Sequence, residues 1–344
     1  MATVPTESRQ WHLFHYPDRY PELSGPNPTF KLVTVPLSPL EEGEVLIKTL
    51  YISNDAAQRV WIVAPESRPR AYVPPVEIGD VMRARSLGKV IDTRSSRLPS
   101  GSLVLVPGGW SEYVVALDDK CTIVPTDSGF NASQYLGALG VTGLTSYYGL
   151  VEIAKATSED VVVVSGAAGA TGNIVVQVAK HLLGCKKVFG IAGTDEKCDY
   201  VRSLGADDCF NYKSTNFQDD MARKLGTEVD VFFGFMFTRM KQGGRIALCG
   251  AISRYNTIAE KVSFKYFDNV ITQRLSLDGF VVLDYLDNLP KVIKLFTKAA
   301  KEGKLQIGGR NETQSVAKFE EIPKVWLSLY EGANHGKLIT KLVE

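Results

Sequence analysis

The most constraining feature of the sequence is a run of four valines at positions 161–164, which a turn of small residues follows as far as Gly172. Four consecutive β-branched residues are too few for a helix and are typical of a strand that is buried on both faces, as in a parallel sheet. Beyond the turn, apolar residues recur at helical spacing up to Gly184, where a helix would end; they are Ile174, Val175, Val178, Ala179 and Leu182. The sequence therefore predicts a strand, a glycine-rich turn and a helix in direct succession.

Such a unit is the first half of a dinucleotide-binding fold. The glycines let the backbone approach a pyrophosphate, and the helix N-terminus supplies N–H groups and a favourable dipole. The turn reads Ala167-x-Gly169-x-x-Gly172, with alanine where the common fingerprint has its first glycine. On its own, this pattern fits a tight structural turn as well as a cofactor site. The candidate cofactor contacts in the turn are Ala167, Gly169, Ala170, Thr171 and Gly172.

The pattern of secondary structure divides the chain into two parts, and 344 residues are long for one hydrophobic core. In the first part, short strands separated by Gly/Pro turns favour a barrel or sandwich; we expect strands at 30–35, 43–50, 88–91, 102–106 and 111–115. In the second part, strands alternate with helices, which favours a doubly wound α/β domain; we expect strands at 161–164, 187–192, 208–212, 229–233, 245–249 and 277–282 and a helix at 291–301. The final stretch, 325–343, is expected to rejoin the β-rich part. We predict one domain at 1–125, completed by 310–344, and a dinucleotide-binding domain at 126–309.

The composition argues against several classes of partner. A net charge of +1 without a basic run is unlike a nucleic-acid-binding protein, and no segment approaches membrane-spanning length. The five cysteines include no C-x-x-C pair, and the four histidines form no ligand pattern, so we expect no zinc site. The first residues lack the apolar core of a signal peptide, and we expect reduced thiols in a cytoplasmic protein.

The tip of the second expected α/β strand bears on the choice of dinucleotide. NAD-dependent enzymes usually carry Asp or Glu there, whereas this chain has Gly193, and Asp195 follows only at the start of the next helix. Lys197 lies in the first turn of that helix, where the helix dipole disfavours a cation unless a phosphate is bound. Tyr212 ends the next strand and could add a hydroxyl donor. These positions favour NADP, although a solvated lysine beside two carboxylates would look the same in sequence.

Catalytic candidates follow the fifth strand of this part. Ser253 and Tyr255 stand just beyond its carboxyl edge, where a nicotinamide would lie. A phenol at that place can donate a hydrogen bond to a carbonyl or enolate oxygen as charge develops. A loop tyrosine packed on its neighbours is the alternative.

Further candidates lie in loops. The stretch 53–82 carries Asn54, Tyr72 and Met82 among many prolines, and we take these three as candidates for the substrate pocket. Asn334 lies in a turn before the last strand and could bind the cofactor. Each of these residues could equally serve as an ordinary turn or cap.

Several motifs together resemble the prostaglandin reductase and plant double-bond reductase family, which comprises zinc-free members of the medium-chain dehydrogenase/reductase superfamily. They cover nearly the whole chain, and Cys249–Asn256 is the most specific; the others lie at 43–48, 78–82, 109–113, 167–172, 195–197, 210–213 and 334–337. The resemblance implies an α/β fold with a GroES-like β-barrel and a doubly wound Rossmann domain. It further implies NADPH-dependent reduction of the carbon–carbon double bond of a small α,β-unsaturated ketone or aldehyde, with a homodimer as a family expectation.

The resemblance also assigns roles to residues. Lys197 and Tyr212 would hold the 2′-phosphate, Tyr255 would assist at the enolate, Asn334 would bind near the nicotinamide, and residues 280–282 would flank its carboxamide. The implied NADP(H) contacts outside the glycine-rich turn are Gly193, Lys197, Tyr212, Cys249, Ser253, Tyr255, Phe280, Val282 and Asn334.

Two departures from the family stand out. Ala57 replaces an aromatic residue that many members carry, which would lower one wall of the substrate pocket. The crossover from Phe233 to Arg245 has only eleven residues, 234–244, and lacks the family's Asp-Asn-Val-Gly-Gly segment on the nicotinamide side. We expect its helix to have barely two turns. One alternative is an NADPH-dependent quinone reductase of the same superfamily, which uses the same hydride donor. The short crossover also leaves open a non-catalytic NADPH-binding protein.

Overall fold

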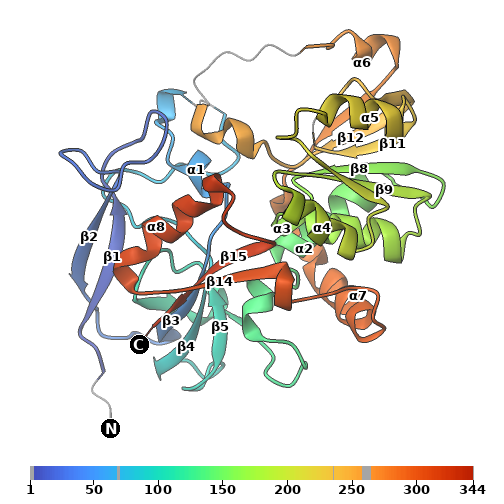
Figure 1. Ribbon diagram of the computed structural model, residues 1–344. Coiled ribbons are helices and arrows are strands. Elements are labelled where there is room, and N and C mark those ends of the chain that lie inside the picture. Colours follow the sequence, from blue (N-terminus) through green and yellow to red (C-terminus); the bar gives the residue numbers. More distant parts are fainter. Residues whose placement is uncertain (1–3, 68–69, 235, 258–264, 344) are drawn as a thin grey trace.

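The computed structural model describes residues 4–67, 70–234, 236–257 and 265–343. Figure 1 shows two lobes, one built from the N-terminal strands together with the C-terminal ones, the other from the intervening α/β segment. Among the described residues, none of the helices has the length and apolar character needed to cross a bilayer.

The α/β lobe contains a six-stranded parallel sheet in the order β10-β9-β8-β11-β12-β13. Its strands are β8 (Val161–Ser165), β9 (Lys187–Ala192), β10 (Asp208–Asn211), β11 (Val229–Phe233), β12 (Met240–Leu248) and β13 (Ser276–Gly279). The chain starts in the middle and winds outward in both directions, so the predicted doubly wound α/β class is confirmed.

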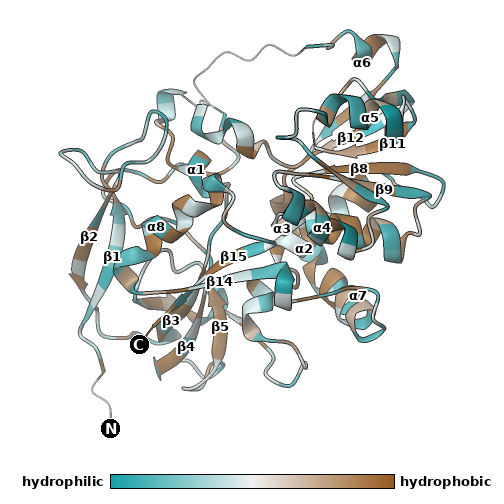
Figure 2. Ribbon diagram, in the orientation of Figure 1, coloured by the Kyte–Doolittle hydropathy of each residue, from teal (hydrophilic) through white to brown (hydrophobic). Residues whose placement is uncertain are grey.

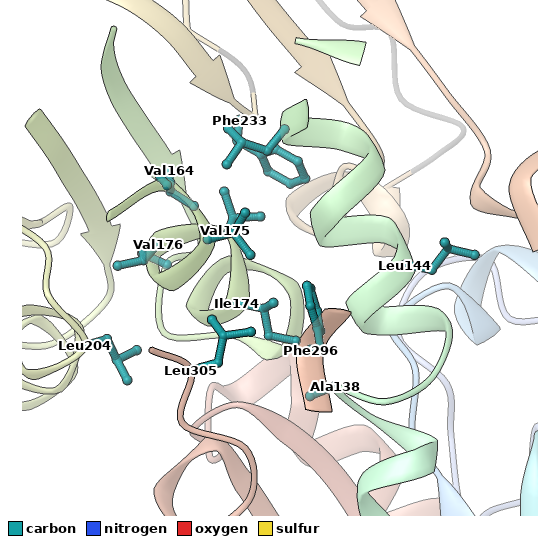
Figure 3. Packing of buried hydrophobic residues seen from close by; sticks show 14 of the residues in the cluster. Ala138, Leu144, Val164, Ile174, Val175, Val176, Leu204, Phe233, Phe296 and Leu305 are labelled. Atoms are coloured by element: carbon teal, nitrogen blue, oxygen red, sulfur yellow. The ribbon is translucent and has the colours of Figure 1, made fainter. Parts of the chain in front are cut away.

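The four valines of β8 lie at the centre of this sheet, as predicted. Val162 and Val164 point to one face and Val163 to the other, and all three are fully buried. Figure 2 shows the strands of the sheet largely brown, as expected when both faces are covered. In Figure 3, Val164 and Phe233 lie against Val175 of the following helix, which joins the first face to that helix.

Helices cover the two faces unequally. The first face packs against α2 (Val141–Tyr147), α3 (Ala170–Gln177), α4 (Asp195–Ser203) and α7 (Leu289–Lys301), whereas the second carries α5 (Phe217–Leu225) and, near the edge, α6 (Asn269–Thr272). The predicted apolar stripe of α3 is buried, and Gly184 adopts a positive φ of 66° just beyond the helical segment.

The β lobe is organised around a seven-stranded sheet that takes strands from both ends of the chain. The N-terminal strands of the lobe are β1 (Glu7–Leu13), β2 (Phe30–Pro36), β3 (Glu44–Ser53), β4 (Ser86–Thr93), β5 (Leu103–Val106), β6 (Tyr113–Leu117) and β7 (Thr122–Ile123). The C-terminal β14 (Glu312–Ala317) and β15 (Lys337–Leu342) extend the seven-stranded sheet, whose order is β14-β15-β3-β4-β5-β7 with β6 also paired to β3. Strands β1 and β2 pair with each other in a separate sheet. Sequence analysis missed β1, β7 and β14, and residues 325–327 belong to α8 (Ile322–Leu327).

Two tryptophans form the centre of the β lobe. Trp110 and Trp326 are fully buried with ring centroids 5.6 Å apart, and Phe30 packs on both. The Trp326 indole N–H donates to the Asp55 carbonyl at 3.1 Å, just before helix α1 (Gln58–Trp61). The C-terminal helix α8 is thereby fixed to the loop that follows β3.

The crossover from β11 to β12 differs from the prediction. Its described residues form no helix, and β12 begins at Met240, five residues before the expected start. Six residues separate the two strands, and the described ones are irregular chain that ends in a turn at 238–239. Phe237, which is 4% exposed, packs beside Phe232 and Met240 and supplies apolar cover where a helix was expected.

We expect Phe237→Ala to lower the free energy of unfolding by about 3–5 kcal/mol, because it removes a buried ring from a sheet face that has no crossover helix. Ile271→Ala is the matched control: Ile271 lies in α6 but is 74% exposed, so its loss should cost about 0.5 kcal/mol or less. Urea unfolding of both variants provides the test. Equally small changes in the free energy of unfolding for both variants would show that Phe237 does not stabilise this face of the sheet.

Candidate active site

The glycine-rich turn between β8 and α3 has the geometry that close approach of a ligand requires. Gly166 has a φ of 57°, and the Gly169 N–H donates to its carbonyl at 2.8 Å. A Cβ at Gly172 would clash with the Gly166 carbonyl and the Ala167 backbone, so the turn tolerates no side chain there. Ala167 is accommodated because the residue opposite it is Gly190, which gives room to its methyl group.

The turn leads directly into the N-terminus of α3. The first N–H groups of a helix have no intrahelical acceptor and carry the positive end of its dipole. Ala170 and Thr171, in the first turn of α3, are partly exposed, as is Gly169 before them. These groups form a cradle for an anion such as a pyrophosphate.

A C-terminal turn lies against the glycine-rich turn. The Gly336 N–H donates to the Ala168 carbonyl at 2.8 Å, and Gly336 pairs with Gly169 in an isolated parallel bridge. Asn334 is held in this turn because its side-chain amide donates to the Gly336 carbonyl at 2.7 Å. The structure thus brings Asn334 next to the residues predicted to bind the dinucleotide.

Lys197 and Tyr212 meet at the tip of β9. The Tyr212 side chain, 54% exposed, lies over Gly193, where an added Cβ would be 3.1 Å from its ring. The Lys197 ammonium donates to the Gly332 carbonyl at 2.8 Å. Burial, followed by the charge of Lys213, lowers the pKa of Lys197, and Glu196 opposes the shift. Two neighbouring cations would be stabilised by a bound anion.

The segment after β12, residues 249–257, is called the 249–257 loop below. It includes a 3₁₀ helix at Ile252–Thr257 that contacts α1 of the β lobe. Cys249 and Ser253 are exposed, and Tyr255 is partly buried, its hydroxyl accepting a hydrogen bond from the Ala251 N–H at 3.2 Å. The loop therefore stands at the carboxyl edge of the sheet and faces the β lobe.

Phe280 and Val282 follow β13 at the same edge of the sheet. The Phe280 ring is 9% exposed and closely approaches Gly149 and Phe233. Val282 is partly buried and packs against the same core. Both residues lie next to the expected nicotinamide region, but the phenyl ring of Phe280 is part of the core.

The predicted substrate-pocket residues differ in burial. Met82 is fully buried in the core with Trp110, and Asn54 is 2% exposed with its amide donating to Thr340 Oγ1 at 2.9 Å. Met82 thus packs inside the β lobe, and its place in a substrate pocket stays a prediction. Tyr72 is 41% exposed and accepts a hydrogen bond from the Trp61 indole at 2.9 Å.

Sequence analysis did not anticipate an ion pair at the base of α1 between a buried lysine and a partly exposed aspartate. Lys337, with a side chain 3% exposed, donates to the Asp55 carboxylate and, at 2.9 Å, to the Asn54 carbonyl. Burial would raise the pKa of Asp55, but the charge and hydrogen bond of Lys337, the Ser53 hydroxyl and Arg85 outweigh it and hold this pKa below the ordinary value. The two partners lie 282 positions apart, so no local pattern could reveal the pair.

Metal-binding side chains do not gather in the described residues: no three His, Cys, Asp or Glu side chains come together as ligands would. The absence of a zinc site remains a prediction, which elemental analysis of the purified protein would test.

Comparison with known proteins agrees with this geometry. Residues 9–124 match the model of an N-terminal domain of oxidoreductase, and residues 170–298 match that of a zinc-binding dehydrogenase. Prostaglandin reductase 1 of Bos taurus is 33% identical, over 97% of this chain and 99% of that protein. NADP⁺-dependent 2-alkenal reductase of Nicotiana tabacum is 31% identical, over 96% of each. CurA from Vibrio vulnificus, solved in complex with NADPH, superposes with a TM-score of 0.87 at 27% identity, covering 98% of this chain and 99% of that one.

The two lobes and the site between them define a medium-chain dehydrogenase/reductase. Within that class, the chain belongs to the prostaglandin reductase and alkenal reductase family, as its motifs predict.

The Asp55–Lys337 pair predicts how stability depends on pH. Because the pKa of Asp55 is lowered on folding, its ionisation stabilises the protein above the ordinary pKa of 3.8, and this contribution is lost as pH falls through the lower, folded-state value. Asp55→Asn should therefore be less stable than the wild type at pH 7, and the difference should shrink below about pH 4. Urea titrations at both pH values measure it. A difference that stays constant with pH would contradict the assignment.

Proposed function

We propose that this protein is an NADPH-dependent reductase that transfers a hydride to the β-carbon of an α,β-unsaturated ketone or aldehyde. The observation that carries the proposal is the meeting of the glycine-rich turn, Lys197 and Tyr255 along one edge of the sheet, opposite α1 of the β lobe. Support also comes from relatives that are named as prostaglandin and 2-alkenal reductases.

The residues present fit NADP(H). Gly172 lets the turn close tightly against the Gly166 carbonyl, and the partly exposed N-terminus of α3 that follows would direct its N–H groups at a pyrophosphate. Lys197 and Tyr212 would hold the 2′-phosphate, and the nearby Lys213 would add charge. Asn334 and the 280–282 segment would flank the nicotinamide half. When bound, the cofactor supplies the hydride for the reaction.

Tyr255 has the chemistry to act on the substrate oxygen. As a hydride reaches the β-carbon of an enone, negative charge develops on the carbonyl oxygen, and a phenol O–H can donate to it. The bond from the Ala251 N–H to the Tyr255 oxygen makes this O–H a better donor, because hydrogen bonds in series polarise one another. Tyr255 would thus stabilise the enolate.

The substrate site would lie between α1 and the 249–257 loop. Ala57 immediately precedes α1, where many family members carry an aromatic residue, so this wall leaves more room. We therefore expect the protein to accept bulky enones better than a relative with that aromatic residue would.

The short crossover favours one alternative. Gly234 lies so close to Ser165 that a Cβ on it would clash with the hydroxyl, and its N–H donates to the Ala247 carbonyl at 3.1 Å. The chain thus leaves the sheet edge without the family's Asp-Asn-Val-Gly-Gly segment, which would weaken nicotinamide positioning more than phosphate binding. If nicotinamide positioning is lost completely, the protein would bind NADPH without catalysing its oxidation.

NADPH oxidation against a panel of enones, enals and quinones, beside an NADPH-binding titration, tests the function. We expect ordinary NADPH affinity and enone turnover with a kcat below that of family members that retain the segment. Turnover of quinones alone would favour the quinone reductase, and tight binding without any turnover would favour the non-catalytic protein.

Two further expectations belong to the proposal. We place the protein in the cytoplasm, since its five cysteines are free thiols and four of them are buried. We also expect a homodimer, which light scattering on the purified protein would test.

Lys197→Ala should weaken NADPH binding roughly tenfold to a hundredfold, because it removes a charge-assisted hydrogen bond worth about 1.5–3 kcal/mol. NADH lacks the 2′-phosphate and serves as the control ligand, so its dissociation constant should hardly change. If a fluorescence titration shows equal losses of affinity for NADPH and NADH, Lys197 does not bind the 2′-phosphate.

Tyr255→Phe should lower kcat on an enone by about 10²–10⁴, because the variant cannot donate to the developing enolate. The NADPH dissociation constant should stay near the wild-type value, since the phosphate contacts come from other elements. An undiminished kcat would show that Tyr255 only packs against its neighbours.

A further inference from the structure

Arg59 is a buried cation without a bonded carboxylate. It lies in α1 and is 1% exposed, although arginine is seldom fully buried unless it is paired. Its bonded acceptors in the described residues are neutral: the Pro17 carbonyl at 2.9 Å, the Arg19 carbonyl at 2.6 and 3.2 Å, and Asn256 Oδ1 at 3.0 Å. One guanidinium nitrogen, Nη1, is buried with no acceptor among these residues. The charge of Asp18 favours the Arg59 cation from a distance, but none of the hydrogen bonds given for Arg59 goes to a carboxylate.

The bonds of Arg59 connect three separate segments. Pro17 and Arg19 belong to the loop between β1 and β2, and Arg59 itself lies in α1. Asn256 belongs to the 249–257 loop of the α/β lobe and is the neighbour of Tyr255 in sequence. The Arg59–Asn256 bond thus crosses between the lobes at the proposed enolate site.

Aromatic residues enclose this junction. The Tyr330 ring packs edge-on against Tyr20 and Trp326, with centroids 6.0 and 5.6 Å away, and its hydroxyl donates to the Ala56 carbonyl at 3.0 Å. Burial raises the pKa of Tyr330, and Arg59 opposes the shift while Tyr255 adds to it, so both residues lie near this phenol. The junction is a packed contact with little room for Arg59 to move.

We propose that Arg59 is a positioning residue: through Asn256 it fixes the 249–257 loop against the β lobe and so sets where the Tyr255 hydroxyl meets the substrate oxygen. A guanidinium suits this role because its rigid fork can hold the β1–β2 loop and Asn256 at once, whereas a lysine ammonium on a flexible stem does not fix the directions of its bonds. The inference rests on the proposed function of Tyr255. Its consequence is kinetic, because misplacing reacting groups by about 1 Å can cost about a hundredfold in rate.

The test uses Asn256→Leu, which removes the bond across the lobes and leaves the bonds of Arg59 to Pro17 and Arg19. We expect kcat on an enone to fall roughly tenfold to a hundredfold, with KM for the enone and the dissociation constant of NADPH changed by less than about threefold. The isotope effect measured with 4-deuterated NADPH should rise, since hydride transfer becomes slower relative to the other steps. Asn256→Asp keeps an acceptor for Arg59 and should restore kcat to within about threefold of the wild type.

Arg59→Lys provides the second arm of a double-mutant cycle. Its kcat should fall by a similar factor, and the double variant with Asn256→Leu should be no slower than the worse single variant, because both substitutions remove the same contact. If the kcat losses of the two single variants multiply in the double variant, the positioning role is overturned. It is also overturned if Asn256→Leu keeps the full wild-type kcat. A loss in Asn256→Leu that is matched by a loss of NADPH binding and of thermal stability would also overturn it, since that is the signature of a merely structural contact.

The outcomes separate this inference from the proposed function. If the wild type reduces enones, and Tyr255→Phe lowers kcat but Asn256→Leu does not, the role of Arg59 alone is overturned. A wild-type protein that binds NADPH and reduces no enone would overturn both.

Discussion

The C-terminal turn from Gly332 to Lys337 is the constraint on which the site depends, because it is bonded to both lobes. On one side, its backbone joins the glycine-rich turn through Gly336, and it accepts a bond from Lys197 at the Gly332 carbonyl. On the other, Lys337 pairs with Asp55 at the base of α1. A side chain at Gly336 would clash with the Asn311 backbone, and its φ of 59° favours glycine in any case. The cradle expected to bind the cofactor and the helix facing the substrate region are thus anchored through one short segment.

Helix α1 links this anchor to the α/β lobe. Asp55 lies just before the helix and is held by Lys337, whereas Arg59 lies within it and reaches the 249–257 loop. A chain of bonds therefore runs from the glycine-rich turn through the C-terminal turn and α1 to the residue next to Tyr255. Preorganisation of this kind is what hydride transfer requires, because the donor carbon, the acceptor carbon and the proton donor must be aligned together. If the short crossover weakens support on the nicotinamide side, as proposed, the fixed position of α1 gains importance.

Features with a local physical cause could be predicted from the sequence. Four valines and a run of small residues dictate β8 and its turn, and helical spacing dictates α3. Features set by distant residues could not. The burial of Met82 depends on Trp110, and the Asp55–Lys337 pair joins residues 282 positions apart. The crossover was mispredicted because a helix usually links parallel strands, whereas the described crossover residues form no helix and the Phe237 ring covers this part of the sheet.

The central claim is that a hydride passes from NADPH to the β-carbon of an enone. The most direct test supplies NADPH carrying deuterium on either face of C4, one label at a time, and locates the label in the product by mass spectrometry and NMR. The account predicts that one of the two labelled cofactors, and not the other, delivers deuterium, and that it resides on the β-carbon of a saturated ketone or aldehyde. Deuterium on the former carbonyl carbon of an allylic alcohol, or a product free of label from both cofactors, would contradict it.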